Sequence, residues 1–444
     1  MKLTPRRSFI RKTSLAALGA GVAPAILKSQ AGVAPNDQVL VGLIGCRNKG
    51  YEILEYHLKH GGVRCTAICD VDQTVLDETS ARLNRDYSQQ PAQFLDYRQL
   101  LESKDLDAVI IGTPDHWHCL PFVDACQAGV DIYVEKPLAN YIAECDVMVK
   151  ATRKYNRIVT VGQQQRSGDS WQAAIDFVKD QRLGTLRKVN IWANFDYGVG
   201  RPVKPDEPVP QGVNFDRWLG PAPARSFNPS RFHGSWRMFW DYGGGLMTDW
   251  GVHLIDMALW AGDITADPTK VMAYGANLSF PQNAHETYDT MSVTFPVENY
   301  VINWEHTAGT QKGPYGRNYG LAFVGDDATL VADRSGWDVY PESQSNRVPR
   351  RAVSEIQFKR KSNEQSMQAH VADFIDCVRS RKEPACPIEV GRQVAVFAHL
   401  ANMAVRSGTG FIDWDSAKGQ CINNPAANAF IKPEYRRPWI FPKV

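Results

Sequence analysis

The chain lacks an excess of charge of either sign, since 50 lysines and arginines stand against 48 aspartates and glutamates, for a net charge of +2. This balance gives no reason to expect nucleic acid or an anionic membrane as a partner. The sequence also lacks any Cys-x-x-Cys pair, and its nine cysteines are an odd number spread along the chain. This pattern argues against a disulfide framework and predicts buried, reduced thiols.

The N-terminus lacks an apolar run long enough to span a membrane, because the uncharged residues 13–27 are few and rich in Ala and Gly. The pair Arg6-Arg7 before this run resembles a twin-arginine export leader. Small residues ending at Ala31 offer a cleavage site, so we expect residues 1–31 to be a signal segment. The protein would then be periplasmic and exported already folded, with its cofactor bound; the alternative is a disordered basic tail.

Residues 37–161 show apolar runs that alternate with helix-compatible stretches. This pattern is typical of an α/β fold with a doubly wound parallel sheet. The predicted strands are 39–44, 63–70, 106–111, 131–134 and 158–161. Because the chain has 444 residues, a second domain is expected beyond this one.

The remainder of the chain has a different pattern, which predicts an α+β domain with a large, mostly antiparallel open sheet. We assign residues 162–388 to this domain and expect it to bind substrate and to form oligomer contacts. Its predicted strands are 187–196, 271–276, 289–295, 301–306 and 319–324. Residues 389–444 predict a long helix and a tail that pack back on the body. The sequence contains no internal repeat.

The turn after the first predicted strand indicates a dinucleotide site. Gly45 suits a tight turn and Gly50 suits close packing of the following helix, with Asn48 between them. Arg47 occupies the position of the usual middle glycine, where it could cover the phosphates or push the cofactor outward. Asp70 ends the second strand, where an acid accepts hydrogen bonds from a ribose diol and repels a 2′-phosphate. The pattern therefore favours NAD over NADP. The alternative for Asp70 is a helix cap, for which Asp72 is better placed.

Two further segments follow strand ends of the same sheet. Thr113 and His118 come after one strand, and we expect them to contact the cofactor. A metal at His116 and His118 is disfavoured because no third ligand lies nearby in the sequence. Glu135 and Lys136 follow the next strand; a structural ion pair is the alternative reading of that lysine.

The segment after a triple glycine carries an acid and a histidine, Asp249 and His253, four residues apart. On an α-helix this spacing puts both side chains on one face, where a carboxylate can orient an imidazole that accepts protons near neutral pH. A core histidine is the alternative. The nearby aromatic segment offers Trp236 and Arg237 for substrate binding, and Gln164 and Arg166 are further candidates.

In their order along the chain these motifs resemble the glucose–fructose oxidoreductase, inositol dehydrogenase and rhizopine-catabolism family (Gfo/Idh/MocA). The matched elements are Gly45…Gly50, Asp70, Thr113-Pro114…His118, Ala128-Gly129…Glu135-Lys136-Pro137 and Gly243-Gly244-Gly245…Asp249…His253…Asp256. The resemblance implies an N-terminal Rossmann domain and a C-terminal domain whose open sheet commonly builds dimers or tetramers. It also places Lys136 beside the nicotinamide, makes Pro137 a frequently cis proline, and assigns Asp249 and His253 to the catalytic site. Arg47 departs from the family pattern.

Together these observations predict an NAD-dependent oxidoreductase that acts on a secondary hydroxyl of a sugar, polyol or glycoside. His253 would be the base, Asp249 would orient it, and Lys136 would donate a hydrogen bond to the substrate oxygen. The predicted cofactor contacts are Gly45, Arg47, Asn48, Gly50, Asp70, Thr113, His118 and Glu135. We expect the NAD to be held tightly and no metal to be needed. The alternatives are a glycosidase that oxidises C3 transiently and eliminates the glycosidic bond, a coupled sugar oxidoreductase, and a cofactor-binding protein without catalysis.

Overall fold

The computed structural model describes residues 37–444 except 104, 347, 360–363 and 423. The predicted signal segment 1–31 lies outside the described residues. In the described part of the chain no helix is long and apolar enough to cross a membrane.

The first half of the chain builds a six-stranded parallel sheet in the order β3-β2-β1-β4-β5-β6, which confirms the predicted Rossmann architecture. Buried apolar runs form its central strands, as expected where helices cover both faces. The strands are β1 (Val39–Ile44), β2 (Val63–Cys69), β3 (Ala92–Phe94), β4 (Ala108–Ile111), β5 (Asp131–Val134) and β6 (Val159–Val161). The helices are α2 (Asn48–His60), α3 (Gln73–Tyr87), α4 (Tyr97–Leu101), α5 (Cys119–Ala128) and α6 (Ile142–Tyr155).

Helices from both ends of the sequence cover this sheet. One face packs on α2, α3 and the distant α10 (Glu364–Ser380). The other face packs on α5, α6 and the start of α11 (Ile388–Arg406). The C-terminal region therefore completes the N-terminal core, which periodicity within residues 37–161 does not reveal.

The second sheet has ten strands in the order β16-β15-β14-β13-β7-β12-β11-β9-β17-β18. All its pairs are antiparallel except β7 with β12, so the predicted, mostly antiparallel sheet is confirmed. Its strands are β7 (Lys188–Ala193), β9 (Lys270–Ala276), β11 (Thr290–Pro296), β12 (Val301–Thr307), β13 (Tyr319–Val324), β14 (Ala328–Asp333), β15 (Gly336–Pro341), β16 (Ile356–Lys359), β17 (Phe411–Asp415) and β18 (Gln420–Cys421). Short β8 (Arg201–Pro202) and β10 (Asn283–Ala284) pair separately.

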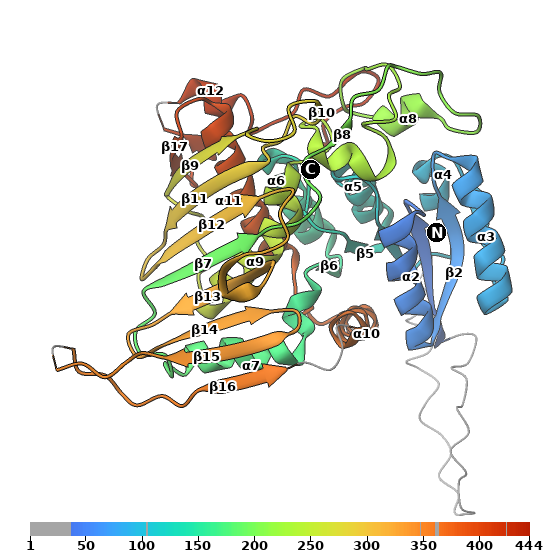
Figure 1. Cartoon of the computed structure of the whole chain (residues 1–444). Coiled ribbons are helices and arrows are strands. Elements are labelled where there is room, and N and C mark those ends of the chain that lie inside the picture. Colours follow the sequence, from blue (N-terminus) through green and yellow to red (C-terminus); the bar gives the residue numbers. More distant parts are fainter. Residues whose placement is uncertain (1–36, 104, 347, 360–363, 423) are drawn as a thin grey trace, which may run out of the picture.

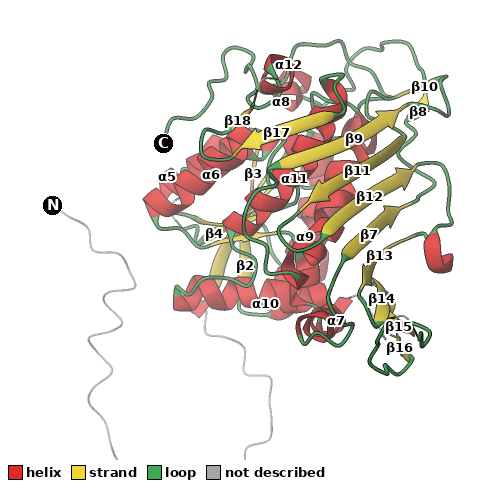
Figure 2. Cartoon of the chain, turned by 90° about the vertical axis from the view of Figure 1, so that its left-hand side faces the viewer, coloured by secondary structure: helices red, strands yellow, loops and turns green. Residues whose placement is uncertain are grey.

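Helices lie on only one face of the large sheet. Its core is formed with α7 (Asp169–Lys179), α9 (Val252–Ala261) and α11. The other face is largely uncovered (Figure 2). The turn Pro314–Gly316 lies over the buried Trp192 of β7, but Met272 and Tyr274 of β9 are exposed. The strand alternates buried and exposed residues, as expected for a sheet covered on one side.

Two segments of the C-terminal half reach across to the first sheet. The connection between β7 and α9, which carries α8 (Phe215–Leu219), extends to the Rossmann domain (Figure 1). There Asn214 donates its backbone N–H to the carbonyl of Val71 at 2.8 Å. The tail after α12 (Pro425–Asn428) joins it, with Arg436 bonded to the carbonyl of Gly220. These crossings form one wall of a cleft at the edge of the first sheet.

Candidate active site

A cleft lies where several parallel strands of the first sheet end. Gly45 follows β1, Asp70 follows β2, Thr113 follows β4 and Lys136 follows β5, and all four line the cleft. Ligands in open α/β sheets bind at this edge because the strand ends and helix N-termini converge there.

The two glycines of the first turn have the predicted roles. Gly45 has a φ of +87°, and a Cβ there would lie 2.8 Å from the backbone at residues 112–113. A Cβ on Gly50 would lie 1.9 Å from the carbonyl oxygen of Gly45. Arg47 is exposed at the cleft and precedes α2 without capping it, and Asn48 lies beside it. The arginine therefore extends at the rim and does not fill the turn.

Asp70 and Asp72 have different roles, one in the cleft and the other as a helix cap. Asp72 caps α3 by accepting from the Thr74 N–H at 3.0 Å. Asp70 lines the cleft and accepts from the Cys46 N–H at 2.8 Å and the Asp72 N–H at 3.2 Å. Burial raises the pKa of Asp70 to about 6, although these backbone donors favour the ionised form. A carboxylate thus stands where a ribose diol would bind.

Three polar atoms of residues that line the cleft are buried without a hydrogen-bond partner among the described residues. They are Thr113 Oγ1, Glu135 Oε1 and, at the aromatic end, Trp439 Nε1. The other carboxylate oxygen of Glu135 accepts from the Lys136 N–H at 3.1 Å. Because unpaired buried polar atoms are costly, these positions suit a bound polar ligand. Together with the glycine turn and Asp70, they fit a dinucleotide. Among the described residues no cluster of His, Cys, Asp and Glu could hold a metal ion.

The centre of the site is an ion pair between the two halves of the chain. The Lys136–Pro137 bond is cis, as the family resemblance implied. Lys136 Nζ lies 2.5 Å from Asp249 Oδ1, and the Tyr197 hydroxyl donates to Asp249 Oδ2 at 3.0 Å. Arg237 Nε is 3.5 Å from the same carboxylate. Burial opposes ionisation of Asp249, but Lys136 and Arg237 outweigh it and hold its pKa well below the usual range.

The expected pairing of Asp249 with His253 is not formed. Residues Met247–Gly251 make a π-helical turn before α9 begins, so α-helical spacing does not apply across it. Lys136 and Tyr197 instead occupy the carboxylate oxygens. His253 Nδ1 is buried without a partner, and burial, reinforced by the charge of Lys136, keeps the histidine pKa well below its ordinary value. His253 is therefore neutral.

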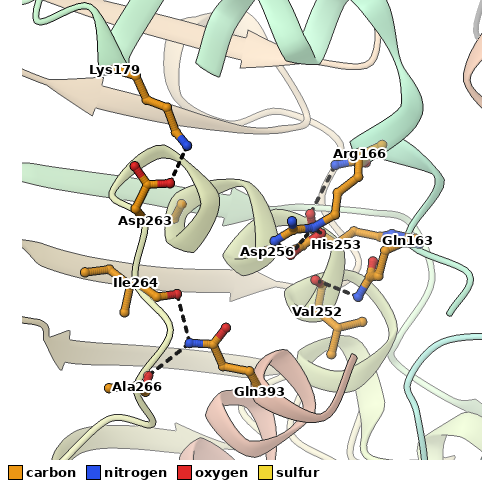
Figure 3. Close-up of polar contacts among 12 residues, drawn as sticks. Gln163, Arg166, Lys179, Val252, His253, Asp256, Asp263, Ile264, Ala266 and Gln393 are labelled. Carbon is orange, nitrogen blue, oxygen red and sulfur yellow. Dashed lines mark hydrogen bonds and ion pairs between the residues drawn. The ribbon is translucent and has the colours of Figure 1, made fainter. Parts of the chain in front are cut away.

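Two predicted contacts have packing roles instead. His118 is buried, and its ring nitrogens lie 2.8 Å from the Pro137 carbonyl and 3.0 Å from the Thr113 carbonyl. It connects the two loops that line the cleft and is not itself among the lining residues. Arg166 makes a bidentate ion pair with the fully buried Asp256 of α9 (Figure 3). Its guanidinium is thus committed to the fold, which corrects the expectation of a substrate contact.

Of the other predicted substrate residues, two line the cleft, and the third, Gln164, is not among the lining residues. Trp236 and Arg237 both line the cleft, with the guanidinium 4.3 Å from the indole ring centre. Gln164 begins the 3₁₀ turn Gln164–Ser167, and its Oε1 is buried without a partner among the described residues.

Sequence reasoning missed three residues of this site. Asp115 lines the cleft, and burial raises its pKa well above the ordinary value; its place in the segment after β4 was an available signal. Tyr197 and Arg334 come from loops of the large sheet, and no local pattern marks them.

The far end of the cleft is aromatic. Trp117, Trp218 and Trp439 line it together with Arg217. Trp439, from the C-terminal tail, packs edge-on against Trp117 with ring centres 4.9 Å apart. Arg217 Nη1 lies 3.0 Å from Asp96 Oδ2. The β7–α9 connection and the C-terminal tail thus cover this end of the cleft at the edge of the first sheet.

Comparison with known proteins agrees with this geometry. A model described as "Oxidoreductase family, NAD-binding Rossmann fold" matches residues 39–163. A second, "Oxidoreductase family, C-terminal alpha/beta domain", matches residues 182–297 and 334–441. Among curated proteins, a "Glycosyl hydrolase family 109 protein" of Shewanella putrefaciens is 31% identical over 159 residues, 35% of each chain. A relative of the same name from Shewanella baltica is 31% identical over 184 residues, 39% of each chain. The chain therefore spans only about a third of the length of such relatives.

Solved structures share the fold. The WlbA dehydrogenase from Bordetella pertussis, in complex with NADH and UDP-GlcNAcA, has a TM-score of 0.62 at 18% identity, covering 85% of this chain and 99% of the other. A levoglucosan dehydrogenase in complex with NADH and levoglucosan has a TM-score of 0.62 at 17% identity, covering 87% and 100%. The two family models together match most of the sequence, and the protein belongs to the Gfo/Idh/MocA oxidoreductase family.

Proposed function

We propose that the protein is an NAD-dependent oxidoreductase acting on a secondary hydroxyl of a sugar, polyol or glycoside. The observation that carries this proposal is the ion pair of Lys136 with Asp249 near a neutral His253, at the edge of the cleft that the glycine turn and Asp70 line. Such a site combines a hydrogen-bond donor for a hydroxyl oxygen with a group able to take its proton.

The residues of the cleft would hold NAD in a defined orientation. The turn from Gly45 to Gly50 would face the pyrophosphate of NAD, and Asp70 would accept hydrogen bonds from its ribose diol. Thr113 and Glu135 would contact polar groups of NAD deeper in the cleft. Asp70 favours NAD because its charge repels a 2′-phosphate. When bound, NAD supplies a hydride acceptor.

Residues of this chain would take the proton of the substrate hydroxyl and stabilise charge on its oxygen. His253 Nδ1, which has no partner among the described residues, accepts the proton of the substrate hydroxyl. Lys136 donates a hydrogen bond to the same oxygen as negative charge develops on it. Asp249 holds the ammonium group and Tyr197 holds the Asp249 carboxylate, so that the direction of the ammonium group is set before substrate arrives.

A glycosidase with transient oxidation at C3 is the second candidate. It is favoured by the local identity to glycosyl hydrolase family 109 proteins, although that identity covers only 35% of the chain. Both candidates use the same first step, so the net fate of the hydride separates them.

The test begins with purified protein, denatured to release any nicotinamide for identification. Intact protein is then incubated with a panel of free sugars and matching glycosides while absorbance at the NADH maximum is followed. Stable NADH formed with a free sugar supports the oxidoreductase. Cleavage of a glycoside without net NADH supports the second candidate, and absence of any NAD affinity contradicts both.

We also propose a cellular location and an oligomeric state for the enzyme. The leader-like residues 1–31 support export by the twin-arginine route, with NAD loaded before export and tightly held. N-terminal sequencing of protein from the periplasm of a Gram-negative host would test this. The uncovered face of the large sheet supports a homodimer or homotetramer, which light scattering would measure.

A further inference from the structure

Arg334 approaches the candidate active site from the turn between β14 and β15. Its Nε donates to Gln165 Oε1 at 3.1 Å, and Gln165 Nε2 donates to the carbonyl oxygen of His253 at 3.1 Å. Its guanidinium also lies 4.6 Å from the ring centre of Trp250. A glutamine tied to the catalytic helix and an aromatic ring thus fix the direction of this cation.

The two terminal nitrogens of Arg334 have no hydrogen-bond partner among the residues that the structure describes. Within the described chain the guanidinium forms no ion pair, and its only hydrogen bond is the one from Nε. Arg166 and Arg317 are paired with Asp256 and Asp333, whereas Arg406 of α11, which lies over Trp240 and Phe430, also forms no ion pair within the described chain but is held between two aromatic rings. Burial lowers the pKa of Arg334, and Tyr319 and Asp249 offset only part of this effect. An anion beside the guanidinium would remove this cost.

The substrate-binding region is where that anion would lie. The charge of Arg334 acts on His253 and lowers its pKa, next to burial and Lys136. Asp249 and Tyr197, in turn, favour the charged form of Arg334. The ring of Trp250, beside which the guanidinium lies, is centred 6.1 Å from the ring of His253, so Arg334 stands next to the group that would take the proton of the hydroxyl.

We propose that Arg334 binds a carboxylate of the substrate, so that the enzyme acts on an acidic sugar such as a hexuronic acid or its glycoside. This inference rests on the proposed function and names its substrate class. A planar guanidinium with two free N–H groups at one edge matches a carboxylate in bidentate geometry. One unpaired positive charge matches a singly charged carboxylate better than a phosphate dianion, since Arg237 is already engaged by Asp249.

The experiment compares glucuronate, glucose and glucose 6-phosphate as substrates of the NAD-loaded protein. We expect kcat/KM for glucuronate to exceed that for glucose by roughly 10- to 100-fold, the range for hydrogen bonds to a charged group. Arg334→Gln should reduce this ratio to near one, and Arg334→Lys should give an intermediate ratio. The matched control is Arg182→Gln, since Arg182 also lies over an aromatic ring, Phe177 at 4.1 Å, but on the exposed surface.

Calorimetric titration with glucuronate separates this inference from the proposed function. If neither sugar reduces the nicotinamide, the oxidoreductase proposal fails, but glucuronate binding weakened by Arg334→Gln and not by Arg182→Gln would still support the anion site. Equal use of glucose and glucuronate, or a preference for the 6-phosphate, would overturn the assignment. Thermal melting identifies a variant that is merely unfolded, and Arg334→Lys, which keeps the charge, then provides the comparison.

Discussion

At the scale of single residues, the carboxylate of Asp249 decides how the site is organised. It accepts from Lys136 and Tyr197 at once and lies near Arg237. Asp249→Asn removes the charge that holds the ammonium group, so we predict that kcat falls by about 100-fold. Steady-state NADH formation measures this. Tyr197→Phe, which deletes one neutral donor, should cost only about fivefold; equal losses in the two variants would contradict this account.

The protonation state of His253 gives a second prediction at this scale. Its folded pKa lies below the ordinary 6.5, first because of burial and then because of Lys136. A group with a lowered pKa stays neutral until the solution is more acidic, so activity should show no loss as pH falls from 8 to 6.5. Lys136→Met removes one cause, and the pKa of His253 should then rise. NMR titration of labelled histidine checks this; an unchanged or lower pKa would be inconsistent with the charge effect.

At the scale of elements, the contact between β1, its turn and α2 depends on Gly50. A methyl group there would overlap the Gly45 carbonyl at 1.9 Å, so backbone must move. We predict that Gly50→Ala lowers the free energy of unfolding by roughly 1–3 kcal/mol or more and weakens NAD binding. Denaturant unfolding measures the first and calorimetry the second. Gly234→Ala is the stability control, because a Cβ there meets nothing within 4 Å.

We predict that the anchoring of the C-terminal tail on α6 depends on pH. Glu144 accepts from the Tyr435 hydroxyl at 2.6 Å, and burial raises its pKa to about 8. In the unfolded chain the carboxyl ionises near its ordinary 4.5, so the folded state binds the extra proton, and this stabilisation is lost as pH rises from 4.5 through 8. Glu144→Gln should therefore gain stability relative to the native protein between pH 5 and 8, by on the order of 1 kcal/mol. Urea unfolding at both pH values tests this; an opposite trend would reject it.

At the scale of the whole molecule, the two crossing segments close the cofactor cleft. Trp439 packs on Trp117 at its far end. Trp439→Ala should release NAD roughly 3- to 10-fold faster, from the loss of one aromatic pair. Stopped-flow displacement of bound nucleotide measures this rate. The neighbouring Ile440→Ala is the control, since Ile440 is 75% exposed; equal acceleration by both variants would show that the tail acts in another way.

The sequence by itself determined the parts of this protein that depend on neighbours along the chain. The parallel sheet follows from apolar runs of strand length, and the roles of Gly45 and Gly50 follow from a turn of six residues. Asp70 and Asp72 could be told apart because a helix cap is a local contact. Lys136 was found in the same way, at the end of a strand.

Tertiary structure decided the contacts between residues far apart in sequence. The partner of Asp249 is Lys136, 113 positions away, and not His253 four positions on, because a π-helical turn intervenes. Arg166 was assigned to substrate because its distant partner, Asp256, gave no local signal. Arg334 comes from the turn between β14 and β15, and no pattern in the neighbouring sequence predicts that this turn reaches the site. Spacing along a helix or strand predicts which side chains share a face, but burial and charge across two packed domains decide which of them meet.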